Sequence, residues 1–288
     1  MKRQAFTLIE IMVGAAISSI IAVAIFALMN AGMILSAKNL SLNLTSNSMR
    51  TALDRVEQGV QQADTMPELI NTSGTVVATG PAAGIKFDRT VGSPYVVSLT
   101  AGSIPSAATS LVLTRSTHAI ASPPPPSPGD IIRIATTATT LRPRVQSVTT
   151  GAVNAALARQ PFTTTLTAAL GTTVTPITAT VVSAKIVRNV AFMVMPANGK
   201  PELRYYHTFD TTTNYNDPTK YSVVTDQIGV AAADATPFSI VQYDGKPFVS
   251  FSLRVRASNA DKGMRAQQIG DYNTFSRTEA LIRPKTIP

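Results

Sequence analysis

The sequence predicts an α+β protein in which one long amino-terminal helix packs on a head of antiparallel β-sheet. Three observations support this fold class. Residues 11–35 are mostly apolar and carry no charge, residues 36–66 continue with helical spacing of apolar side chains, and residues 67–288 contain short apolar runs separated by turn sequences. We therefore expect a helix whose second half covers a sheet.

Composition excludes several classes of catalytic site. The 288 residues include no Cys and two His, which excludes a thiolate nucleophile, a disulfide framework and a zinc cage of Cys and His. No Gly-x-Ser-x-Gly elbow, Walker loop or dinucleotide-binding fingerprint occurs. We expect a protein that is not an enzyme and that needs no cofactor, with calcium, considered below, as the single alternative.

The first 35 residues have the properties of a membrane-spanning helix. Lys2 and Arg3 precede the 25 uncharged residues 11–35. As a helix this stretch is about 37 Å long, enough to cross a hydrocarbon core of roughly 30 Å. Basic residues before the span predict a cytoplasmic amino terminus, with the remainder outside the inner membrane. A secretory signal peptide is the alternative, but its apolar region is shorter, about 7–15 residues.

A carboxylate, Glu10, stands at the head of this apolar helix. An ionisable residue in such a place is costly and usually has a partner. We therefore expect a cation to pair with Glu10.

The motif Ala5-Phe6-Thr7-Leu8-Ile9-Glu10, after a short basic leader, resembles the prepilin signature of type IV pilins and type II secretion pseudopilins. The resemblance implies cleavage between Ala5 and Phe6 by a prepilin peptidase and N-methylation of Phe6. It also implies that Glu10 faces the amino-terminal ammonium of a neighbouring subunit. Two departures are Ala5, where most members have Gly, and the absence of Pro near Ala27.

By the same resemblance the fold is pilin-like, and the chain spans the bacterial inner membrane with a periplasmic head before it joins a filament at the cell surface. The implied partners are other pilins through the amino-terminal helix, the prepilin peptidase and the inner-membrane assembly platform. The expected parts are a leader at 1–5, a transmembrane and assembly helix at 6–35, an amphipathic helix at 36–66 and a β-rich head at 67–288.

The second half of the helix carries an apolar stripe that predicts its packing face. Spacings of three and four place these residues on one side of the helix: Leu42, Ser46, Met49, Leu53, Val56, Val60 and Ala63.

Hairpin signals organise the head. Asn198-Gly199 joins predicted strands at 190–195 and 202–207, and Asp244-Gly245 joins strands at 238–243 and 248–257. Other predicted strands are 75–78, 84–88, 95–99, 110–115 and 130–135. Residues 118–182 hold a Pro-rich run and many Thr, which predicts a decorated surface loop region or a small accessory sheet.

Two groups of residues are candidate binding sites in the head. An oxygen-rich loop could supply hard ligands for Ca²⁺ from Asp210, Asn214, Asn216 and Asp217, although Asp and Asn also cluster in ordinary turns. Between Arg89 and Lys200, nine basic residues accompany one acidic residue, Asp130. This excess favours polyanions such as nucleic acid, with these candidate ligands: Arg115, Arg133, Arg142, Arg144 and Arg159.

The predicted function is assembly: a minor pilin of a type IV pilus, similar to the large PilW-like minor pilins, that initiates or caps the filament. A type II secretion pseudopilin is one alternative. A tip adhesin or DNA-uptake module is another, and an exported protein that stays anchored and never polymerises is a third.

Overall fold

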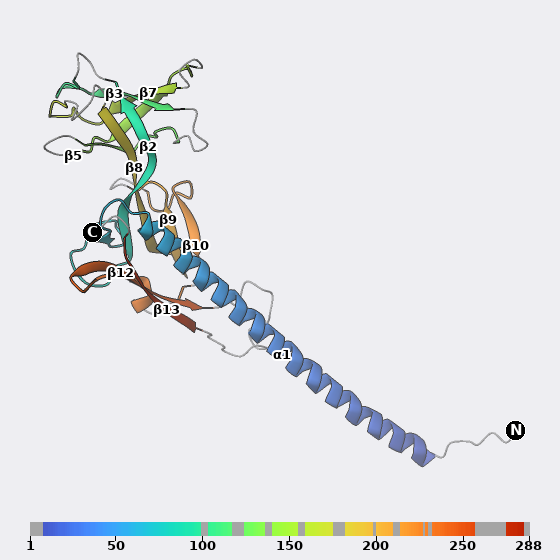
Figure 1. Cartoon of the computed structure of the whole chain (residues 1–288). Coiled ribbons are helices and arrows are strands. Elements are labelled where there is room, and N and C mark those ends of the chain that lie inside the picture. Colours follow the sequence, from blue (N-terminus) through green and yellow to red (C-terminus); the bar gives the residue numbers. More distant parts are fainter. Residues whose placement is uncertain are drawn as a thin grey trace.

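The computed structural model describes residues 8–98, 103–116, 124–135, 140–154, 159–174, 182–197, 200–209, 214–226, 228–229, 232–256 and 275–284. It confirms the α+β fold class: one long helix, α1 (Leu8–Gln61), joins a head of antiparallel sheet. The first half of α1 projects away from the head, and its second half lies against the head (Figure 1). The strands are β1 (Glu68–Ile70), β2 (Gly84–Val97), β3 (Ser110–Ser116), β4 (Ile131–Ala135), β5 (Thr140–Leu141), β6 (Val145–Thr150), β7 (Arg159–Leu166), β8 (Val182–Ala197), β9 (Lys200–Tyr206), β10 (Tyr221–Thr225), β11 (Phe238–Tyr243), β12 (Lys246–Arg256) and β13 (Phe275–Ile282), with a 3₁₀ turn, η1, at Ala232–Ala235.

The helix α1 runs for 54 residues because neither Pro nor a cluster of turn residues interrupts it. The last turn of the helix is tighter than the rest. The amide of Gln62 donates to the carbonyls of Gln58 and Gly59, and the amide of Ala63 donates to the carbonyl of Val60. The chain then pairs with β2, since the amide of Asp64 donates to the carbonyl of Asp88 at 2.7 Å.

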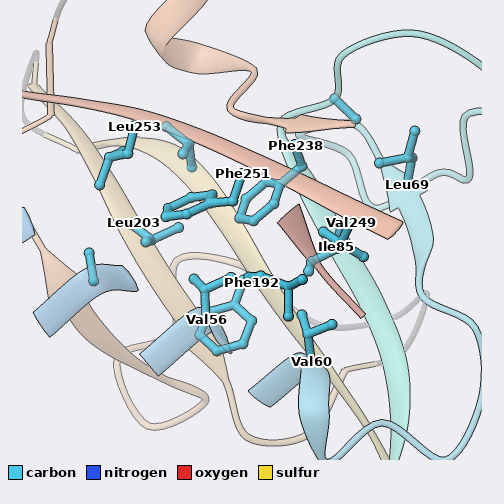
Figure 2. Packing of buried hydrophobic residues seen from close by; sticks show 14 of the residues in the cluster. Val56, Val60, Leu69, Ile85, Phe192, Leu203, Phe238, Val249, Phe251 and Leu253 are labelled. Carbon is cyan, nitrogen blue, oxygen red and sulfur yellow. The ribbon is translucent and has the colours of Figure 1, made fainter. Parts of the chain in front are cut away.

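The second half of α1 packs into an apolar core that we call the proximal core. Val56 and Val60 lie fully buried among side chains of β2, β8, β9, β11 and β12 (Figure 2). Gly59 permits the close approach, since a Cβ there would lie 2.5 Å from a ring carbon of Phe192. The predicted stripe was wrong at Ser46, which is exposed; Thr45 is buried instead, as is Ala52.

The strands among the described residues form two antiparallel sheets. The larger has ten strands with the main order β10-β9-β8-β2-β3-β7-β6, and the smaller has the order β11-β12-β13. The predicted Asp244-Gly245 hairpin is confirmed: both residues have positive φ, 52° and 69°, and the flanking strands pair from Phe238↔Phe251 to Tyr243↔Lys246. The predicted 190–195 and 202–207 pair is also confirmed as β8 and β9, and its turn lies outside the described residues.

The strand prediction at 75–78 was wrong, and the strands predicted at 84–88 and 95–99 were correct as strand but wrong in being separate. Residues 75–78 contain one isolated bridge, Ile70↔Val76, while the strand in this region is β1. The predicted strands 84–88 and 95–99 are one continuous strand, β2, whose pairing with β8 shifts register near Gly92. A bulge of this kind lets Gly92 lie within one continuous strand.

The distal part of the head is a small closed barrel. Pairing runs from β8 to β2, β3, β7 and β6, and β4 returns to β8. The gap between β6 and β4 is closed by the bridge Ile131↔Arg144 and by a 2.8 Å bond from the amide of Val145 to the carbonyl of Asp130. The segment that composition marked as an insert thus supplies much of the barrel, around a second core that includes Tyr95, Leu113, Ile132, Phe162 and Ile186.

Two long strands connect the barrel to the proximal core. The ladder between β2 and β8 runs from Gly84↔Met193, beside α1, to Val97↔Val182 in the barrel. The barrel therefore lies beyond the carboxyl end of α1, on the side of the head away from the amino terminus (Figure 1).

Candidate functional site

The first half of α1 is an exposed apolar surface. Leu8–Ser36 has a mean hydropathy of 2.6 and is long and apolar enough to cross a membrane. The head buries none of the most apolar part of this segment, and Leu8, Phe26 and Leu28 are each more than 70% exposed. A surface of this kind needs lipid or other apolar helices as its surroundings. The candidate assembly site is therefore this half-helix.

Glu10 lies in the first turn of α1 as the structure describes it, among exposed apolar side chains such as Ile9 and Ile11. A carboxylate in the first turn is favoured by the partial positive charge at the amino end of the helix. The processing residues Ala5 and Phe6 lie outside the described residues.

Three arginines of the basic stretch between Arg89 and Lys200, which we call the basic middle, form ion pairs where the barrel meets the proximal part of the head. Arg133 donates to Asp64 at 2.5 Å, and Arg142 pairs with Asp88. Arg188 donates to both oxygens of the fully buried Asp130, from Nε at 2.5 Å and from Nη2 at 2.9 Å. We call these three pairs the junction. Asp64 and Asp88 precede the basic middle in the sequence, so a local charge count missed their contribution.

The remaining candidate polyanion ligands are spread over the barrel. Arg144 donates to the carbonyl of Gly129 at 3.3 Å. Arg115 donates to Gln160 at 2.8 Å and lies over the ring of Phe162, and its neighbour Ser116 pairs with Arg159 across β3 and β7. The structure brings Arg115 and Arg159 to the same end of one ladder. Polyanion binding stays a prediction.

The oxygen-rich loop is held by its own hydrogen bonds. The Asn214 side chain accepts from the amide of Asn216, and the Asp217 carboxylate accepts from the amide and hydroxyl of Thr219 at 2.9 and 2.7 Å. These bonds from Thr219 lower the pKa of Asp217. The buried Arg204 donates to the Asn216 side chain at 3.3 Å. Asp210 lies outside the described residues, so calcium binding stays a prediction.

Sequence reasoning missed a cavity of about 450 Å³ between the second half of α1 and the sheet. Its lining side chains come from α1, β2, β8 and β10 and from the end of β9, segments far apart in the sequence: Thr51, Arg55, Gln58, Gly59, Gln62, Arg89, Phe192, Tyr205, His207, Ser222, Val223 and Val224. No short motif could have signalled it, because the residues converge only in the folded chain.

Comparison with known proteins identifies one feature of the chain. Residues 1–26 match the family model described as the prokaryotic N-terminal methylation motif. No curated protein and no solved structure matches the chain. The match supports the predicted likeness to type IV pilins and pseudopilins, and the roles of Ala5, Phe6 and Glu10 stay predictions.

Proposed function

We propose that this chain, whose prepilin-type N-terminal methylation motif supports the type IV pilin and pseudopilin family, is a minor pilin that initiates or caps a type IV pilus. The apolar half-helix and the motif agree with membrane anchoring before assembly. In this proposal the amino terminus is cytoplasmic, the head is periplasmic, and the chain later enters a filament.

Processing is the first step. A prepilin peptidase cuts between Ala5 and Phe6 and removes the two leader charges, Lys2 and Arg3. The new terminus, methylated on Phe6, remains a cation at neutral pH. The motif match at residues 1–26 supports this step.

Assembly then replaces lipid around α1 with other apolar helices. Association of such helices depends on close side-chain packing and on satisfied polar groups, because lipid is as apolar as the helix surface. Pairing of Glu10 with the ammonium of a neighbour's terminus would fix the axial register, since a buried carboxylate that loses its partner costs several kcal/mol by typical values.

The single observation that carries a terminal position is the barrel. In a filament whose helices run parallel, the next subunit stacks toward the carboxyl end of α1. The barrel lies beyond that end (Figure 1). In such a stack it would occupy the space that the next head needs. A subunit of this shape fits at the tip, where it can initiate or cap the filament.

Substitution of Glu10 tests the assembly role. Glu10→Ala should lower the amount of this chain in sheared filaments by at least about tenfold, because the register-setting pair is lost. The head should melt at an unchanged temperature, since this half of α1 is not buried in it. Ser19→Ala is the matched control in the same half-helix, because Ser19 bonds internally to the carbonyl of Ala16. Normal incorporation of Glu10→Ala would remove Glu10 from the mechanism.

A type II secretion pseudopilin is the second candidate, because that class shares the motif. Deletion of the gene separates the two: loss of surface filaments supports the pilus, and loss of protein secretion with filaments intact supports the pseudopilin.

A further inference from the structure

The cavity beside α1 is cationic. Arg55 of α1, Arg89 of β2 and His207, the residue directly after β9, line it, and none of the lining residues in the described part of the chain is acidic. Both arginines are charged at any physiological pH, so the cavity holds two fixed positive charges. The chemical class that these charges favour is an anion.

Two of these groups, Arg89 and His207, contact the aromatic side chain of Tyr205. Nη1 of Arg89 donates to the hydroxyl of Tyr205 at 3.3 Å. The Tyr205 ring packs against Phe192, with centroids 4.9 Å apart, and meets the His207 ring edge to face at 5.0 Å. Burial, followed by the nearby Arg188 and Arg55, lowers the pKa of His207. The two arginine contributions to this shift show that positive charge lies near His207, as the lining residues Arg55 and Arg89 also indicate.

One wall of the cavity is an edge strand. β10 pairs with β9 and with no other strand among the described residues, and its residues Ser222, Val223 and Val224 line the cavity. Val223 is 49% exposed. An edge strand offers backbone groups that an extended peptide can bond to, while a pocket beside it selects the side chains.

We propose that this cavity binds a carboxylate side chain on an extended peptide segment of a neighbouring filament subunit. Arg55 and Arg89 hold the carboxylate, and the edge of β10 pairs with the peptide backbone. The source of the peptide rests on the proposed function, because a neighbour packed along α1 would bring its own residues to this cavity. Peptide binding itself does not require a filament.

Binding to the unassembled full chain in detergent micelles tests the site. The probe is a fluorescein-labelled hexapeptide of sequence Thr-Val-Glu-Val-Glu-Thr, compared with the same peptide containing Gln in place of Glu. Fluorescence anisotropy in 50 mM salt should show roughly tenfold tighter binding of the Glu peptide, since charge-assisted hydrogen bonds are the stronger ones.

Variants of two helix arginines locate the binding. Arg55→Gln should weaken binding of the Glu peptide by about fivefold and leave binding of the Gln peptide unchanged, as expected for a solvent-exposed charge contact. Arg50→Gln is the matched control, because Arg50 is exposed on the same helix and does not line the cavity. Its effect should stay below about twofold. Unchanged melting temperatures for both variants establish that the fold is retained.

Four results would overturn the proposal. They are equal binding of the Glu and Gln peptides, an equal loss with Arg50→Gln, inorganic phosphate that displaces the peptide at the peptide's own concentration, and single-stranded DNA that binds with the same dependence on Arg55. Failure of the chain to enter filaments while peptide binding persists would instead count against the proposed function, so the two failures are distinguishable.

Discussion

Arg188 and Asp130 form a two-point ion pair between β8 and the turn before β4, with both oxygens of the fully buried carboxylate engaged. The same carboxylate accepts from the amide of Ser127 at 2.8 Å. One side chain therefore links a barrel turn to one of the strands that connect the barrel to the proximal core. The junction pairs of Asp64 and Asp88 lie on the segments that enter this region from α1 and β2.

We predict that Asp130→Asn destabilises the head by about 3 kcal/mol, because it leaves the Arg188 charge without its compensating carboxylate. Urea unfolding followed by circular dichroism measures the change. Asp226→Asn is the control, since Asp226 is exposed and its substitution removes the same charge. Equal midpoints for the two variants would mean that the junction contributes nothing to stability.

The stability of the head should depend on the protonation of His207. Partial burial and the charges of Arg188 and Arg55 place the pKa of His207, whose side chain is still largely exposed, below its value in the unfolded chain, about 6.5. As the pH falls through 6.5, the unfolded chain takes up the proton more readily than the folded chain, so stability decreases toward low pH.

His207→Gln should therefore flatten the fall in melting temperature between pH 7.5 and pH 5.5. His118→Gln changes the other histidine of the chain and serves as the control. An identical slope in the wild type and His207→Gln would contradict a shifted pKa at this site.

Removal of the barrel separates its proposed tip role from the rest of the head. Thr90 and Val187 are ladder partners, so an Asn-Gly turn in place of residues 91–186 would join β2 to β8 and remove every residue of the barrel core. The shortened chain should retain the cooperative unfolding of the proximal core.

In filaments labelled with immunogold, the shortened chain should be found along the shaft as well as at the tip, because the blocking volume is gone. Labelling confined to the tip, as for the full chain, would show that another feature sets the position.

Local patterns were sufficient for the elements whose cause is local. The α1 helix follows from an apolar run without breakers, and the Asp244-Gly245 turn follows from two residues that tolerate positive φ. The predicted apolar stripe on α1 was close to the observed buried face. It failed at Ser46 because a small polar residue does not indicate whether its position is buried or exposed.

Features that depend on distant pairing could not be predicted in this way. The bulge in β2 hides the continuity of the strand, since Gly92 looks like a break until β8 lies beside it. The Thr-rich strands β6 and β7 look weakly specified, and their buried Val145, Phe162 and Leu166 find a core only in the folded barrel. The junction and the cationic cavity likewise bring together residues that lie far apart in the sequence.

Mass spectrometry of the mature amino terminus tests the central claim most directly. The protein is purified from the membrane fraction and from filaments, and its amino-terminal peptide is sequenced. The proposed function predicts a chain that begins at N-methylated Phe6, with Met1 to Ala5 removed. An unmodified chain that still begins at Met1 would contradict it.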